Sequence, residues 1–235
     1  MPELPEVESA RRVIAAAALG RRIDDVDDSD TFECRPHQPG DIRAALLGRR
    51  LCAVHRRGKS MWCDTSGIGR SRTAGPALGI HLGMSGRVVV TDGHGAVAEG
   101  GDYWRRGRDP DDLRFVRFSL HFADGGALYL LDPRRLGRVR LEPAVELLGP
   151  DALDVTLAQL RAIVARGTAP VKARLLDQHA IAGVGNLLAD EMLWLARISP
   201  AVRVDQLRPN QVARLHRALR RSLTAAIAQG GVHTG

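Results

Sequence analysis

The chain has 235 residues, of which 44% are hydrophobic and 26% are charged. These proportions exclude a disordered or collagen-like protein and allow one large domain or two small ones. A formal net charge of +7 and a sequence pI near 10.3 predict a polyanionic partner, most simply nucleic acid. No apolar run approaches the roughly 18 residues that span a bilayer, and the start lacks a signal-peptide pattern. We therefore expect a soluble, cytoplasmic protein with no membrane partner.

Cysteine and lysine are both scarce in this sequence. The three cysteines, Cys34, Cys52 and Cys63, are too few and too scattered for a disulfide scaffold, and none forms a C-x-x-C pair. They predict isolated thiols and no metal site. Among 34 Lys and Arg residues only Lys59 and Lys172 are lysines, so the reason for each is worth asking.

The first half of the chain is rich in strand signals. A helix is expected first, because Val7, Ala10, Ile14 and Ala17 recur near helical spacing and Gly20 can end the run. Short strands separated by turns are then expected at residues 51–57, 60–64, 77–82, 87–91, 114–122, 127–131 and 138–141. Residues 93–112, rich in Gly, Arg and Asp, predict a loop.

The second half has helical periodicity instead. Helices are expected at residues 156–166, 171–178, 186–196 and 210–229. Strands followed by helices indicate an α+β chain of two domains. We place the division so that residues 1–142 form an N-terminal catalytic domain and residues 143–235 a helical domain.

The most unusual segment is the start, Met1-Pro2-Glu3-Leu4-Pro5-Glu6-Val7-Glu8. One interpretation is a proline-opened helix with acidic residues in its first turn, which suits the helix dipole. The other begins from removal of Met1, which leaves Pro2 as a terminal secondary amine. An α-amino group titrates near roughly 7.7–8.0, so a useful fraction is neutral and can form a Schiff base with a sugar aldehyde carbon. Glu3 beside it could carry protons.

Three later motifs also suggest chemistry. They are His81-Leu82-Gly83-Met84-Ser85-Gly86, Asp132-Pro133-Arg134-Arg135-Leu136-Gly137 and Gly183-Val184-Gly185-Asn186. The last ends in an Asn that we expect to cap a helix, and backbone N–H groups in such a turn form a natural phosphate site. Each motif alone has an ordinary alternative, since Met84 could fill a core and glycine turns between helices are common.

In this combination and order, the PELPEVE start and the HLGMSG, DPRR and GVGN motifs resemble the formamidopyrimidine-DNA glycosylase/endonuclease VIII family of base-excision repair enzymes. The resemblance implies an N-terminal β-sandwich with an N-terminal helix, followed by a helical domain with a helix–two-turn–helix motif. It also implies a monomer that acts on damaged double-stranded DNA, removes oxidised bases and cleaves the strand by β- and δ-elimination through an N-terminal proline Schiff base. PELPE favours the formamidopyrimidine branch over the endonuclease VIII branch.

The resemblance also implies catalytic roles for particular residues. Pro2 resembles the nucleophile that attacks C1′, and Glu3 resembles the acid/base that helps ring opening and elimination. Glu6 resembles a supporting carboxylate. Lys59 matches a hairpin lysine that contacts phosphate near the lesion; the alternative for Lys59 is a solvated hairpin tip.

Further positions match DNA-contacting residues of the family. Met84, Arg134 and Leu136 match residues that fill the gap left by an extruded base, which offsets part of the cost of unstacking. Leu136 stands where 8-oxoguanine enzymes commonly have Phe. Asn186 resembles the phosphate-binding Asn of the helix–two-turn–helix motif. Lys172 is expected near backbone phosphate or, equally, on a solvated helix face.

The family usually continues into a zinc or zincless finger, which we expect to be absent from this chain unless the chain is a fragment. We therefore expect no cofactor here, and zinc only if a finger beyond Gly235 exists. An alternative function is a non-catalytic damaged-DNA binding protein of the same fold, impaired by loss of the finger. A third is a general helix–two-turn–helix nucleic-acid binder, such as a ribosomal or topoisomerase domain, which does not explain the PELPEVE start.

Overall fold

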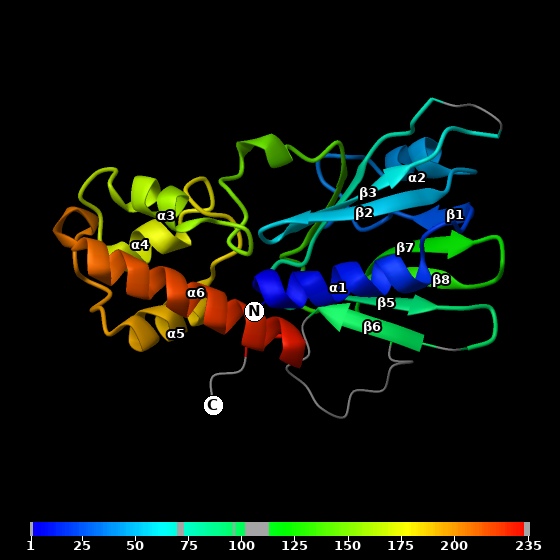
Figure 1. The fold of residues 1–235 in the computed structure, drawn as a ribbon. Coiled ribbons are helices and arrows are strands. Elements are labelled where there is room, and N and C mark those ends of the chain that lie inside the picture. Colours follow the sequence, from blue (N-terminus) through cyan, green and yellow to red (C-terminus); the bar gives the residue numbers. More distant parts are fainter. Residues whose placement is uncertain (1, 70–72, 96, 102–112, 233–235) are drawn as a thin grey trace. The chain divides into compact units, whose positions relative to one another are not determined.

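A computed structural model describes residues 2–69, 73–95, 97–101 and 113–232. The chain divides into two compact units (Figure 1). We call them the sheet unit, which runs to Ala144, and the helical unit, which begins at Val145. The helical unit also includes two short segments from early in the chain, residues 3–5 and 57–59. The sequence prediction placed both segments in the first domain, because it divided the chain at a single point after residue 142.

The early part of the chain supplies two helices and nine strands among the described residues. They are α1 (Leu4–Ala17), β1 (Ile23–Asp27), α2 (Asp41–Leu46), β2 (Leu51–Arg57), β3 (Ser60–Thr65), β4 (Leu78–His81), β5 (Arg87–Thr91), β6 (Val97–Gly101), β7 (Val116–Phe122), β8 (Ala127–Leu131) and β9 (Arg138–Leu141). One sheet has the strand order β1-β7-β8-β5-β6 and the other β2-β3-β4-β9. The strand pairs β1–β7, β7–β8, β8–β5, β5–β6, β3–β4 and β4–β9 are antiparallel.

Alternation of side chains explains how the sheet unit forms its core. Val88 and Val90 on β5 join the same buried cluster as Leu128 and Leu130 on β8, as expected where every second residue of a strand faces one side. The α1 helix adds Ile14 and other residues one turn apart to this cluster, so its apolar stripe is buried.

The helical unit consists of four helices and two short 3₁₀ helices among the described residues. They are α3 (Leu157–Val164), α4 (Val171–Leu176), α5 (Asn186–Ala196) and α6 (Pro209–Gln229), with 3₁₀ turns at Val145–Leu147 and Val204–Gln206. Thr156 and Gln159 form a capping box at the start of α3. Pro209 opens α6, and Gly230, with φ +81°, ends it. The core of this unit includes Leu4 as well as the helices.

The elements differ from the sequence prediction in three places. Strand β1 and helix α2 were not predicted. Strand β6 lies in residues 93–112, which were predicted to be a loop, and that part of the prediction is wrong because residues 97–101 pair with β5. The rest of that stretch, residues 102–112, lies outside the described residues. No helix of the described residues is long and apolar enough to cross a membrane.

Candidate active site

The carboxylate of Glu3 is held by the first turn of helix α5. Its Oε1 accepts a hydrogen bond from the Leu187 amide at 2.8 Å, and its Oε2 accepts from the amides of Gly185 and Leu188 at 2.9 and 3.1 Å. Glu3 is fully buried, and Pro2 before it is also buried. The first amides of a helix have no partner within the helix, and the positive end of the helix dipole attracts negative charge. These donors therefore fix the Glu3 carboxyl group at the start of α5.

This arrangement corrects one expectation about the GVGN turn. The N-cap of α5 is Gly185, not Asn186, which is the first helical residue and is exposed. The Gly185 amide of this turn is bound to Glu3, as are the Leu187 and Leu188 amides that follow it, so the Gly185 amide does not hold a phosphate here. The reason is that an intramolecular carboxylate occupies the anion site first. A phosphate contact of the Asn186 side chain stays a prediction.

Gly185 is required by this contact. A Cβ atom at this position would overlap the Glu3 carboxyl group. The backbone of Gly185 is extended, with φ −115° and ψ −168°, so a larger residue would be excluded by lack of space and not by backbone strain.

The hairpin tip before Lys59 packs against the same turn. Gly58, with φ +60°, donates its amide to Asp151 Oδ2 at 2.6 Å. A Cβ on Gly58 would stand 2.7 Å from the Gly183 nitrogen, so the tip approaches that backbone too closely for a side chain at this position. The Leu4 amide donates to the Gly183 carbonyl at 3.2 Å. The helical unit thus brings Glu3 and the hairpin tip that carries Lys59 to one turn, Gly183–Gly185.

Lys172 is already paired. Its Nζ lies 2.7 Å from Asp190 Oδ1 in a half-buried salt bridge. A DNA phosphate at this lysine therefore has to compete with the Asp190 carboxylate.

In the sheet unit, the turns that carry Met84 and Leu136 touch each other. Gly83 has φ +56°, and a Cβ there would overlap the backbone of Leu136 and Gly137. Met84 is 36% exposed and Leu136 44% exposed. Two large apolar side chains therefore stand in solvent on turns that are in contact, which does not support the alternative of a core role for Met84.

Asp132 shapes the loop that carries Arg134 and Leu136. Its Oδ1 accepts from the Arg134 amide at 3.1 Å, and its Oδ2 accepts from the amides of Leu136 and Gly137 at 2.8 Å each. The Asp132 carboxylate is fully buried. Arg134 itself is exposed. The DPRRLG motif therefore folds around its first residue and leaves the arginine side chain available to a partner.

Two carboxyl groups of the PELPEVE segment are buried in the sheet unit. Glu6, predicted as a supporting carboxylate, is 4% exposed in the first turn of α1. Glu8 was not predicted as a site residue and accepts hydrogen bonds from Arg11, Arg12 and Arg56. Burial opposes the ionisation of Glu8, but these three guanidinium groups lower its pKa to about 2. Glu8 therefore acts as a structural anion at neutral pH.

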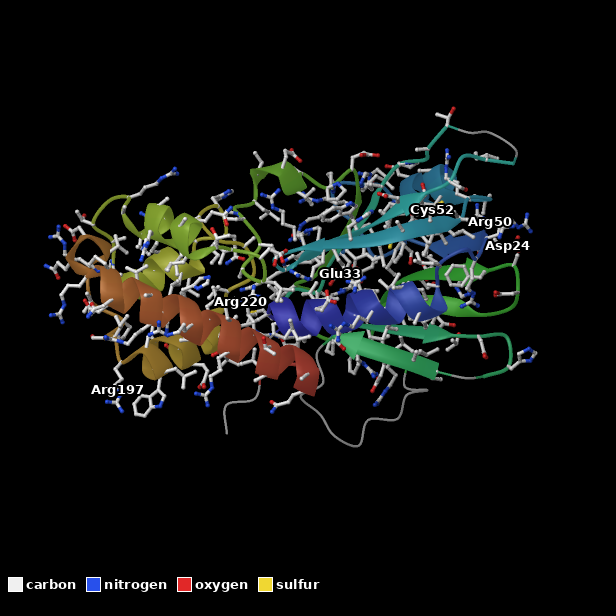
Figure 2. All side chains as sticks on the ribbon, in the orientation of Figure 1. Asp24, Glu33, Arg50, Cys52, Arg197 and Arg220 are labelled. Carbon is white, nitrogen blue, oxygen red and sulfur yellow. The ribbon has the colours of Figure 1, made fainter. Side chains whose placement is uncertain are left out.

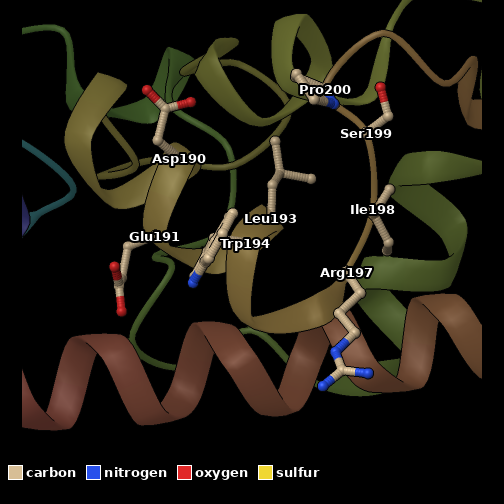
Figure 3. Close-up of a pocket in the computed structure, with 8 residues that line it drawn as sticks. All are labelled: Asp190, Glu191, Leu193, Trp194, Arg197, Ile198, Ser199 and Pro200. Carbon is tan, nitrogen blue, oxygen red and sulfur yellow. The ribbon is translucent and has the colours of Figure 1, made fainter.

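A pocket of about 760 Å³ lies along α5 and the segment that follows it (Figure 3). Its lining includes Trp194, which is 81% exposed, and the charged residues Asp190, Glu191 and Arg197. None of the predicted site residues lines it. The predicted chemistry therefore does not depend on this pocket. Across the described residues, no group of three or more His, Cys, Asp or Glu side chains is placed to hold a metal ion.

Comparisons with known proteins identify the family of this chain. The model of the formamidopyrimidine-DNA glycosylase N-terminal domain matches residues 1–139, and that of the formamidopyrimidine-DNA glycosylase H2TH domain matches residues 148–235. The formamidopyrimidine-DNA glycosylase of Chloroflexus aurantiacus is 35% identical over 98% of this chain and 78% of its own length. That of Arabidopsis thaliana is 31% identical over 97% of this chain and 58% of its own length.

Solved structures of Fpg proteins are also similar to this chain. The MutM (Fpg) protein of Thermus thermophilus is 33% identical with a TM-score of 0.75, over 98% of this chain and 77% of that one. The Lactococcus lactis Fpg in complex with DNA containing an abasic site is 26% identical with a TM-score of 0.78, over 97% of this chain and 80% of that one. The chain belongs to the formamidopyrimidine-DNA glycosylase family. The predicted fold, an N-terminal β domain followed by a helix–two-turn–helix domain, is confirmed.

Proposed function

We propose that this chain removes oxidised bases from double-stranded DNA and then cleaves the strand as an abasic-site lyase. The observation that carries the proposal is the fixed carboxylate of Glu3, one peptide bond from Pro2 and bound to three amides of α5. A secondary amine beside a positioned proton carrier is what Schiff-base chemistry on a sugar requires. Membership of the glycosylase family and the net charge of +7 support DNA as the partner.

The reaction begins when the Pro2 nitrogen, free after removal of Met1, attacks C1′ of the damaged nucleotide. The bond from C1′ to the base breaks, and the leaving base takes a proton from water. The Glu3 carboxylate takes the proton that the attached Pro2 nitrogen loses. Glu3 then delivers this proton to O4′ as the ring opens, which gives an iminium between C1′ and the Pro2 nitrogen. Loss of a C2′ proton expels the 3′ phosphate, and loss of a C4′ proton then expels the 5′ phosphate. Hydrolysis of the iminium returns the amine.

The remaining predicted residues bind and hold the DNA in this proposal. Lys59 and Asn186 contact phosphates around the lesion. Met84, Arg134 and Leu136 enter the gap left by the extruded nucleotide, and Arg134 hydrogen-bonds the base left without a partner. Extrusion costs a few kcal/mol, and apolar side chains that enter the stack recover part of it.

Reductive trapping tests the proposal. Borohydride added during incubation with abasic DNA should give a covalent protein–DNA adduct, and mass mapping should place it on residue 2. Pro2→Gly should give a slower adduct, because glycine still presents a terminal amine, whereas the matched Pro5→Ala control should trap like the parent. An adduct on Lys59 or Lys172 contradicts the assignment. Specific binding without any adduct identifies the alternative, a non-catalytic damaged-DNA binding protein.

A further inference from the structure

Glu33 lies in the segment between β1 and α2 and is fully buried in the sheet unit (Figure 2). Its Oε1 accepts a hydrogen bond from the Gly137 amide at 3.2 Å, which ties this segment to the loop after β8. Among the residues that the structure describes, none donates a hydrogen bond to its Oε2. A buried carboxylate oxygen without a donor is costly, so the ionised form of Glu33 is poorly accommodated here.

The group that Glu33 meets is Asp132, which is also buried. Besides the three loop amides, Asp132 accepts the hydroxyl hydrogen bond of Ser85, which follows Met84 directly. Two carboxyl groups that share a buried site cannot both ionise without strong repulsion. A proton on Glu33 Oε2 supplies the donor that this atom lacks, and Asp132 is the acceptor it faces.

The remaining charges around Glu33 do not reverse this conclusion. Within the described part of the chain, the other titratable or charged groups found to interact with it are Asp30 and Cys34 from its own segment and Arg138 from β9. Asp30 is paired with Arg135 at 2.7 Å. Burial first, and the Asp132 carboxylate second, raise the pKa of Glu33 to about 8. Burial opposes ionisation of Asp132 as well, but hydrogen bonds from Ser85, Glu33 and the loop amides lower its pKa.

The Glu33–Asp132 pair joins the two turns that the proposed function assigns to lesion extrusion. Ser85 brings the turn of Met84 to Asp132, and Gly137 brings the loop of Arg134 to both carboxyl groups. A Cβ on Gly137 would stand 2.7 Å from Glu33 Oε2. The Glu33–Asp132 pair therefore packs against the backbone at Gly137, which helps to position the side chains of Arg134 and Leu136.

We propose that Glu33 is a positioning residue whose shared proton holds the turns of Met84, Arg134 and Leu136 in the arrangement that keeps a lesion gap open. The proposal rests on the proposed function, which gives those three side chains their role. Loss of the proton leaves two adjacent carboxylates, and their repulsion loosens the end of the loop at Gly137. The side chains of Met84, Arg134 and Leu136 then fill the gap less well. The groups proposed to break bonds, Pro2 and Glu3, are unchanged.

The first test uses the free protein and needs no DNA. Amide resonances of Leu136 and Gly137, followed by nuclear magnetic resonance from pH 6 to pH 10 (a window about the pKa of 8 given for Glu33), should shift with a midpoint near that value. Glu33→Gln keeps a neutral donor and should abolish the transition. Glu146→Gln, at an exposed glutamate of the helical unit, should leave it unchanged. If these amide resonances show no pH transition in the parent, or show the same transition in Glu33→Gln, the proposal of a shared proton is overturned.

The second test measures insertion of side chains into the gap on a DNA analogue that does not react. A duplex with a tetrahydrofuran abasic analogue and 2-aminopurine opposite it reports side-chain insertion as a fluorescence change at saturating protein. About a tenth of Glu33 stays protonated one pH unit above its pKa, so the parent signal should fall roughly tenfold from pH 7 to pH 9. Glu33→Gln should keep its signal, and Glu33→Ala should be weak at both values.

The outcomes separate the two proposals. A parent signal independent of pH, with amides that do titrate, overturns the positioning role and leaves the proposed function intact. Absence of binding to the abasic duplex overturns the proposed function and, with it, the role of Glu33 in DNA, although the amide titration would still show the shared proton. A fall of equal size in Glu33→Gln assigns the pH effect to another group and overturns the proposal.

Discussion

The helical unit and the sheet unit each bury one glutamate completely, Glu3 and Glu33, and surround it with opposite partners. Glu3 faces three backbone donors at the start of a helix. Glu33 has one donor, one unpartnered oxygen and a neighbouring carboxylate. Burial alone therefore does not decide how a carboxyl group is accommodated, because the donors around it matter as well. In the two proposals, Glu3 carries protons at the sugar and Glu33 retains a proton that it shares with Asp132.

The largest loss of activity is expected from a substitution that moves the Glu3 carboxyl group but leaves Glu3 itself in the sequence. In Gly185→Ala the new methyl group occupies the space of the Glu3 carboxyl group, so base removal should fall about 100-fold or more, as is typical when general acid–base catalysis is lost. Cleavage at a preformed abasic site should fall less. Single-turnover assays on duplexes with one 8-oxoguanine or one abasic site measure both.

Leu187→Ala is the matched control for Gly185→Ala. It trims a half-buried side chain in the same helical turn and keeps the amide that binds Glu3. The Leu187→Ala protein should be less stable to unfolding than the parent but should still remove the base. Equal loss of base removal in both variants means that α5 stability matters, and not the placement of Glu3.

A smaller effect is expected at Arg134, on the loop that Asp132 organises. Arg134→Ala should slow removal of 8-oxoguanine roughly tenfold more than cleavage at an abasic site, because a bidentate base contact contributes about 1–3 kcal/mol and an abasic site has no base to extrude. Arg134→Lys keeps the charge but not the planar fork, so it should resemble Arg134→Ala. Rescue by lysine, or equal slowing on both substrates, identifies a general electrostatic contact instead.

The pH dependence of stability sharpens the contrast between the two glutamates. Burial and the Asp132 carboxylate raise the pKa of Glu33 in the folded state from the ordinary value of 4.5 to about 8. Its protonated form therefore stabilises the fold fully below pH 4.5, and that contribution is lost as pH rises towards 8. The free energy of unfolding of the parent, relative to Glu33→Gln, should fall over this window by at most about 1.4 kcal/mol per pH unit and be flat above it. Urea denaturation at five pH values measures this difference, and a rising difference contradicts it.

The smallest effect concerns the thiols. Burial raises the pKa of Cys63 to about 12, and burial together with the nearby acidic groups, Glu33 among them, does the same for Cys34. Cys52 is exposed (Figure 2). A disulfide reagent should therefore modify one thiol per native chain and three per unfolded chain, since thiolates react and buried thiols do not. Rapid labelling of Cys34 would show that the Glu33 environment opens readily.

Much of the fold could be predicted from local pattern. The bounds of β2, β5, β8, β9 and α5 match the sequence prediction because each has a clear period and a clear turn at its ends. Strand β1 was missed because three of its five residues are Asp and its pairing with β7 shifts register between Ile23 and Asp25, which breaks the alternation of two. Helix α2 is only six residues long, too short for a helical period to show.

The site was predictable in its residue types but not in its contacts. The Glu3 carboxylate and the Gly185 amide are 182 residues apart, and no local signal indicates that a carboxylate fills that helix start. Asn186 therefore looked like the cap. Glu33 stands in an acidic turn with no motif, and its importance becomes visible only when Asp132, 99 positions later, is placed beside it.

The contact between Glu3 and α5 also has a consequence for the order of events during synthesis. The first residues leave the ribosome long before α5 exists, since domains form from the N-terminus as the chain emerges. Until some 180 further residues have been made, the Glu3 carboxyl group lacks the amides that hold it. In the proposed function, removal of Met1 can therefore precede the placement of Glu3. The Glu3 carboxyl group acquires its three amide partners only when the last third of the protein has been made.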